Sequence, residues 1–144
     1  MQSVSQLVSV AERIKAIPEA GLSLGEAETL KFLKDESDKL ANIAKELNDV
    51  VAKGDFKGAI QALTRLIVRV NVMGSLALQP AVLSSLGNPN LRNSLVDLIG
   101  SALSIIEETY FELLPKAKDN GIKSFSLNVN TNPLSVVLSL GTGE

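Results

Sequence analysis

The side chains that most often perform catalysis are scarce in this chain. It contains no His, no Cys and no Trp, so triads that use His and zinc sites that use His or Cys are excluded. Carboxylate pairs remain: Glu108 and Glu112 lie one turn apart on a predicted helix, and Glu26 and Glu28 lie near a predicted helix start. Acid–base catalysis also needs a pocket and perturbed pKa values. We therefore interpret these carboxylates as solvated, and we predict no catalytic residue, no cofactor or metal site, and no small-molecule substrate. The expected protein is not an enzyme.

Three arginines could instead contact phosphate. Arg65 and Arg69 are four residues apart, so they share one face of a predicted helix, and Arg92 begins a later helix. Guanidinium groups gathered on one surface would bind DNA even on a chain whose formal net charge is −2. Contact with DNA requires that they line one surface, with the N-terminal acids facing away. The alternative is ion pairing at the bundle surface with acids of the last long helix, namely Glu107, Glu108 or Glu112.

The distribution of charge along the chain favours burial against other proteins. Apolar residues make up 45 % of the 144 residues and aromatic residues only 3 %, so the core must be aliphatic. Between Pro80 and Ile106 only Arg92 and Asp97 are charged, and residues 124–143 carry no charge. The uncharged stretches are interrupted by Asn, Gln, Ser and Pro, so we expect no membrane span. The N-terminus also lacks the basic segment and apolar stretch of a signal peptide.

Helical periodicity predicts four main helices, over residues 3–17, 24–53, 56–78 and about 90–114, with a short helix over 80–86. Each carries apolar residues at the spacing of one buried helix face. Ser23 and Glu26 have the spacing of a capping box, and Asp55 can cap the third main helix. On the second helix, we expect a charged and solvent-exposed face that contains Asp35, Glu36, Asp38 and Lys39.

The period changes to two at the C-terminus. Apolar residues alternate with Ser and Asn on both sides of Asn132-Pro133, which predicts a β-hairpin. The expected fold class is mainly α: an antiparallel helical bundle of about four main helices with a short C-terminal β-hairpin. Residues 1–121 would form the bundle. Residues 122–144 would form the hairpin and tail, either within the same single domain or as an arm between subunits.

Two regions are expected to contact other copies of the chain. The third main helix is apolar nearly all round, and the hairpin has no charge to protect its edges. We expect lysine at Leu127 or Val136 to solubilise the protein without unfolding the bundle. Gly74 and Gly100, each inside a helix, indicate close approach of a neighbour, either internal or from another subunit. The predicted assembly surface comprises Leu66, Val68, Val72, Leu76, Phe125, Leu127, Val129, Leu134, Val136 and Leu138.

In gross plan, the segments Leu30–Val51, Phe56–Leu78 and Leu91–Leu113 resemble the bundle helices of the α-helical coat (major capsid) proteins of archaeal spindle-shaped and two-tailed viruses. The resemblance covers about half of the chain and implies subunits that stack through apolar contacts, with DNA inside the assembly. We therefore expect a homo-oligomeric structural protein, a virion coat or filament subunit, located in the virion. The alternative is a small helical binding module, an inhibitor or accessory subunit of a larger enzyme, located in the cytoplasm.

Overall fold

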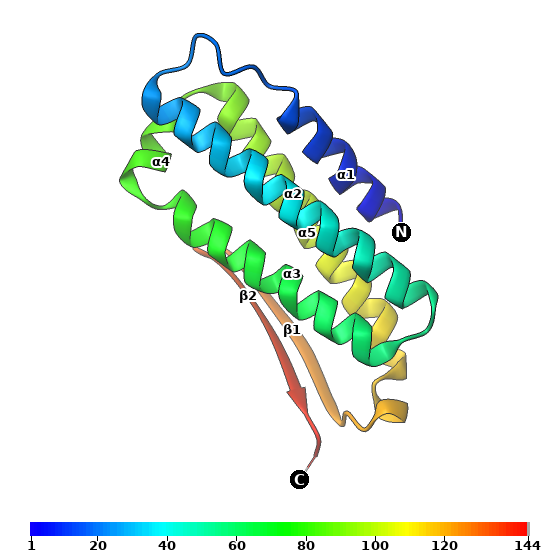
Figure 1. The fold of residues 1–144 in the computed structure, drawn as a ribbon. Coiled ribbons are helices and arrows are strands. Elements are labelled where there is room, and N and C mark those ends of the chain that lie inside the picture. The colour runs from blue at the N-terminus through cyan, green and yellow to red at the C-terminus, as the bar shows by residue number, and fades with distance from the viewer. Residues whose placement is uncertain (144) are drawn as a thin grey trace.

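Four helices form an up-and-down bundle, and a two-stranded sheet lies against one of its faces (Figure 1). The structure is a computed structural model that describes residues 1–143. Neighbouring helices in the bundle run in opposite directions: the first packs on the second and on the last, and the third does the same. The bundle helices are α1 (Gln2–Lys15), α2 (Leu24–Ala52), α3 (Phe56–Ala77) and α5 (Pro89–Leu113).

A short helix, α4 (Pro80–Ser85), joins α3 to α5 at one end of the bundle and packs on the beginning of α2. Two single turns of 3₁₀-helix, η1 (Leu114–Lys116) and η2 (Lys118–Asn120), lead from α5 to the strands β1 (Ser124–Thr131) and β2 (Leu134–Gly141). These elements confirm the predicted mainly α bundle with a C-terminal hairpin. Their boundaries lie within two residues of the predicted ones.

Helices α2 and α3 begin at side chains that satisfy free backbone N–H groups. The Ser23 hydroxyl accepts a hydrogen bond from the Glu26 N–H, and the Glu26 carboxylate accepts one from the Ser23 N–H, so the predicted capping box is formed. The Asp55 carboxylate accepts from the Gly58 N–H at 2.9 Å and caps α3, as predicted. Each such cap contributes about 1 kcal/mol to helix stability.

The core is aliphatic and is shared by all four helices. Leu7, Leu33, Leu63 and Leu98, one from each bundle helix, are completely buried. The apolar stripe that each helix shows in the sequence therefore faces the interior. No helix among residues 1–143 has both the length and the hydrophobicity that crossing a membrane requires.

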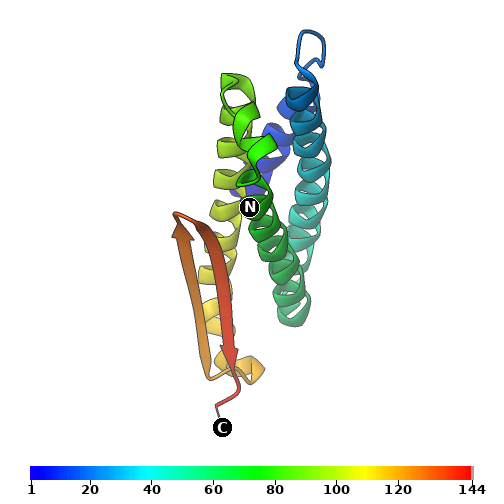
Figure 2. The ribbon, with the colours of Figure 1, turned by 90° about the vertical axis from the view of Figure 1, so that its left-hand side faces the viewer.

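The hairpin lies along α3 and α5, on the side of the bundle away from α2 (Figure 2). In its antiparallel register Phe125 faces Leu140, Leu127 faces Leu138, and Val129 faces Val136. The apolar members of these pairs, apart from the exposed Leu140, pack against the helices, whereas Ser126, Asn128 and Ser139 are exposed. Because a two-stranded hairpin is marginally stable alone, burial of its apolar face on the bundle is the main source of its stability.

Candidate assembly surface

Two polar side chains of the bundle fasten the hairpin. The Asn71 amide of α3 donates to the Val136 carbonyl at 2.9 Å and accepts from the Val136 N–H at 2.9 Å. The Tyr110 hydroxyl of α5 donates to the Phe125 carbonyl at 2.8 Å, and the two rings lie 4.8 Å apart. Each helix under the sheet thus holds one strand through that strand's backbone.

The two helix glycines that the sequence singles out have different surroundings. A methyl group at Gly74 would come within 3.1 Å of the Leu134 side chain, so glycine lets β2 approach α3 closely. A methyl group at Gly100 would meet nothing within 4 Å. The neighbour of Gly74 is therefore internal, whereas Gly100 has no close neighbour within the described chain.

The structure corrects the predicted assembly surface at Leu66 and Val136. Leu66 is completely buried in the bundle. Val136 lies on the face of β2 that packs on the helices and is 2 % exposed, so neither residue is available to another subunit. The other predicted hairpin residues are half-buried against the subunit's own core, because the apolar face of the sheet needs a cover and α3 and α5 supply it. These residues are Phe125, Leu127, Val129, Leu134 and Leu138.

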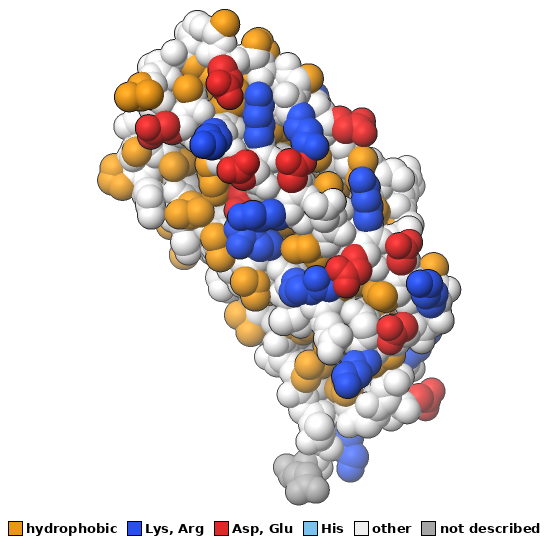
Figure 3. Space-filling view, viewed as in Figure 1, with side chains coloured by type: hydrophobic (Ala, Val, Ile, Leu, Met, Phe, Trp, Pro, Cys, Tyr) orange, Lys and Arg blue, Asp and Glu red, His pale blue; other side chains and the backbone are white. Residues whose placement is uncertain are grey.

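Val68, Val72 and Leu76 do lie on the outer side of α3, with Val68 exposed and the other two half-buried. The structure adds three leucines at the end of the bundle that contains α4: Leu24 is 79 % exposed, Leu78 is 60 % exposed, and Leu83 is also exposed. Hydrophobic side chains gather over α4 and along α3 at the left edge of Figure 3. We call this surface the apolar strip; it comprises Val68, Val72, Leu76, Leu78, Leu83 and Leu24.

The three leucines at the α4 end cannot be predicted from helical periodicity. Leu24 is the first residue of its helix, Leu78 follows the last turn of α3, and Leu83 lies in a helix of six residues. A helical period cannot be read from positions at helix ends. The signal that could have found them is the uncharged run from Val70 to Leu91, which includes two of the three.

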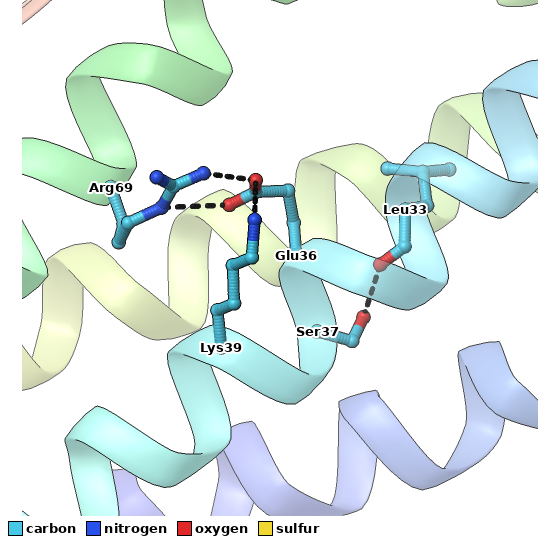
Figure 4. Close-up of polar contacts among 5 residues, drawn as sticks. All are labelled: Leu33, Glu36, Ser37, Lys39 and Arg69. Carbon is cyan, nitrogen blue, oxygen red and sulfur yellow. Dashed lines mark hydrogen bonds and ion pairs between the residues drawn. The ribbon is translucent and has the colours of Figure 1, made fainter.

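The structure contradicts the prediction that Glu36 faces solvent: it is 3 % exposed. Its carboxylate accepts two hydrogen bonds from the Arg69 guanidinium, one from Nε at 3.2 Å, and Lys39 Nζ lies 3.8 Å from Oε1 (Figure 4). The neighbouring Ser37 is also buried, and its hydroxyl donates to the Leu33 carbonyl at 2.7 Å. Glu36 is buried because α3 brings a cation to it, which the sequence of α2 alone does not reveal.

Arg65 is paired as well. Its Nη2 lies 2.6 Å from Glu46 Oε1, and this hydrogen bond lowers the pKa of the Glu46 carboxyl and raises the pKa of the Arg65 guanidinium. Arg92 lies on the first turn of α5, where it donates to the Leu86 carbonyl at 3.4 Å. Two of the three arginines considered for phosphate contact are therefore ion-paired with acids of α2, in keeping with the alternative of ion pairing. The predicted partners Glu107, Glu108 and Glu112 are wrong, since the partners are Glu46 and Glu36.

Two of the carboxylates considered for catalysis, Glu108 and Glu26, have structural partners. Glu108 accepts a hydrogen bond from the Ser3 hydroxyl of α1. Glu26 accepts from the Ser23 backbone and from the Asn88 amide at 3.0 Å, and these bonds lower its pKa. Within residues 1–143, no three acidic side chains come together in a way that could hold a metal ion.

A surface groove of about 670 Å³ runs between α1 and α5. Its lining includes the small residues Ser9, Gly100 and Ser104, and two other lining residues, Arg13 and Asp97, form an ion pair of 2.6 Å. Its polar side chains include Gln6 and Ser101, and the groove is open to solvent.

Comparisons with known proteins identify no relative. No protein-family model matches the chain, and neither a curated protein nor a solved structure matches it. Its function must therefore be inferred from its own surfaces.

Proposed function

We propose that this chain is a structural protein that assembles with copies of itself into a virion coat or a filament. The observation that carries the proposal is the apolar strip. It places exposed leucines at one end of the bundle, and two of them, Leu78 and Leu83, lie in the uncharged run from Val70 to Leu91. Exposed apolar surface of this kind typically marks a protein contact.

The energetics suit a contact that is repeated many times. Full burial of one exposed leucine side chain is worth about 2 kcal/mol. Leu24, Leu78 and Leu83 together would contribute several kilocalories per mole before the cost of association is subtracted. No charge between Val70 and Leu91 has to be desolvated in the process. Such a contact is weak between two copies and becomes strong when each subunit makes it with several neighbours.

A second apolar surface lies at the opposite end of the molecule. Phe111 is 65 % exposed and Leu114 is also exposed, where α5 ends far from α4 (Figure 1). Contact between two different surfaces of the same subunit is heterologous, and such contacts generate rings or open filaments. Apolar surfaces at both ends therefore favour head-to-tail contacts between copies.

The charged side of the bundle would remain in solvent. Figure 3 shows basic and acidic side chains interspersed over α1 and α2. Since Arg65 and Arg69 are ion-paired, the proposal relies on apolar contacts and assigns no DNA contact to these arginines. Enclosure of DNA would then depend on the geometry of the particle.

The test is a triple substitution in the strip, Leu24→Gln, Leu78→Gln and Leu83→Gln. The unmodified protein is expected to form large particles or filaments in negative stain and in the ultracentrifuge, and the triple variant is expected to remain small. The matched control is Val96→Gln with Val137→Gln, because these exposed valines lie outside the strip. Unmodified protein that stays monomeric at every concentration, or a triple variant that assembles normally, would overturn the proposal.

The second candidate is a small helical binding module that docks on a larger enzyme as an inhibitor or accessory subunit. The same exposed leucines favour it, because a different protein could cover them. The ultracentrifuge separates the two candidates. A module is a lone monomer at all concentrations, whereas a coat or filament subunit grows in size as its concentration rises.

A further inference from the structure

The two edges of the hairpin differ in what covers them. At the β2 edge, Asn71 of α3 holds both backbone polar groups of Val136. At the β1 edge, Tyr110 bonds the Phe125 carbonyl near the beginning of the strand. Within residues 1–143, no other hydrogen bond reaches β1 from outside the hairpin. Beyond Phe125, the outer edge of β1 is therefore open.

The pairing pattern identifies the backbone groups along this open edge. Because Val136 directs both of its backbone polar groups at Asn71, Val136 and the opposite Val129 form a non-hydrogen-bonded pair. The pattern alternates along the strand, so Val129 and Leu127 direct their N–H and C=O groups away from β2. A row of such groups is a template for another strand.

The devices that usually protect a sheet edge are missing on β1. Natural edges carry charged side chains, proline or bulges, but residues 124–143 are uncharged and the register of β1 with β2 has no bulge. The exposed side chains of β1 are Ser126, Asn128 and Asn130. Two copies of this strand can therefore lie side by side without repulsion between like charges.

An exposed aromatic ring lies beside the same edge. The Phe111 ring packs against Tyr110 at 5.3 Å, and Tyr110 packs in turn against Phe125 at 4.8 Å. This row of rings leads from the strand to a phenylalanine that is largely in solvent. A strand added beside β1 would find an apolar contact there.

We infer that β1 pairs antiparallel with β1 of a second copy, about a two-fold axis, to form a four-stranded sheet across two subunits. An axis perpendicular to the sheet keeps apolar side chains opposite apolar ones and Ser and Asn opposite Ser and Asn, so both bundles lie on one side. This inference rests on the proposed self-assembly and names one of its contacts. An uncharged edge is self-complementary in this arrangement, which is why the partner is another copy of the chain.

The test uses single cysteines, since the chain has none of its own. Asn128→Cys places a thiol at the middle of β1, on the exposed side of the sheet, and Ser139→Cys places one on the same side of β2. With a short bis-maleimide, Asn128→Cys is expected to give a covalent dimer and Ser139→Cys to remain monomeric. A thiol at the exposed Asn42 of α2 measures the background of random collisions.

A charge provides the second measurement. Asn128→Lys brings two lysines close together across the proposed contact and is expected to weaken association in the ultracentrifuge, whereas Ser139→Lys is expected to leave it unchanged. If the unmodified protein associates but cross-linking is equal on β1 and β2, or stronger on β2, the strand pairing is overturned and self-assembly stands. If the unmodified protein does not associate at all, the proposed function fails as well.

Discussion

The α1–α2 side of the molecule and the α4–hairpin side use opposite means of positioning their elements. On the first side, ion pairs join α2 to its neighbours: Lys15 of α1 lies 2.5 Å from Asp38, and Arg65 of α3 lies 2.6 Å from Glu46. On the second side, hydrogen bonds from the neutral side chains of Asn71 and Tyr110 hold the hairpin against the helices. Charges keep the first side hydrated, whereas residues 70–91 and 124–143, which contribute to the second side, carry no charge.

Each kind of contact also sets the register between two elements. The buried Glu36–Arg69 pair specifies how α2 lies on α3, since a carboxylate that is withdrawn from water needs its cation at one position. Asn71 specifies how β2 lies on α3, because its amide forms hydrogen bonds with both the N–H and the C=O of Val136. Both are polar contacts at an apolar interface.

The largest effect is expected from adjacent substitutions in β2. Val136→Lys would place a charge in a position that is 2 % exposed, whereas Val137 is 49 % exposed. We expect Val136→Lys to lower the free energy of unfolding by about 3 kcal/mol or more, and Val137→Lys to change it little. Urea denaturation checks this. Equal stability of the two variants would show that the hairpin does not pack on the bundle as described, and the sequence-based expectation for Val136 would then hold.

The second largest loss of stability is expected when the buried Glu36–Arg69 ion pair is broken. Arg69→Met leaves the Glu36 carboxylate buried with only Lys39 near it, and we expect a loss of about 2–3 kcal/mol, somewhat below the usual range because Arg69 is partly exposed. The double variant Glu36→Met/Arg69→Met removes both charges and should regain most of the loss. Chemical denaturation of the single and double variants measures the coupling. A double variant as unstable as the single one would mean that shape, and not charge, joins α2 to α3.

Alanine substitutions at the two helix glycines form a matched pair, for which we expect smaller changes in stability. Gly100→Ala fills open space and should stabilise the isolated subunit by about 0.5–1 kcal/mol. Gly74→Ala gains the same helix propensity, but its methyl group must displace Leu134, so the net gain should vanish or turn into a loss. Thermal unfolding of both variants at low protein concentration tests the difference. A stabilising Gly74→Ala would show that the hairpin is not held closely against α3.

The smallest effect concerns pH at the beginning of α2. Hydrogen bonds from Ser23 and Asn88 lower the pKa of Glu26 in the folded protein. A carboxyl with a lowered folded-state pKa contributes stability above its unfolded pKa, and this contribution is lost as the pH falls through the folded-state value. The stability difference between the unmodified protein and Glu26→Gln should therefore shrink on acidification below the ordinary glutamate range. A difference that is independent of pH would show that the capping carboxylate is not ionised in the folded state.

Much of the fold could be predicted because its signals are local. Capping residues such as Ser23 and Asp55, the apolar stripes of the long helices, and the alternation around Asn132-Pro133 each act within a few residues. The candidate surface was harder to predict. Val68, Val72 and Leu76 could be found because they add to an already complete apolar stripe, whereas Leu24, Leu78 and Leu83 lie at helix ends where no period can be seen.

The sequence by itself determined the helices, the hairpin, the aliphatic core and the absence of charge from residues 124–143, because these depend on composition and on short spacings. Tertiary structure alone decided that Glu36 is buried beside Arg69, that Leu66 and Val136 belong to the subunit's own core, and that the edge of β1 is the less covered one. Each of these depends on a partner that is distant along the chain, and only packing of the helices and the sheet brings the two together.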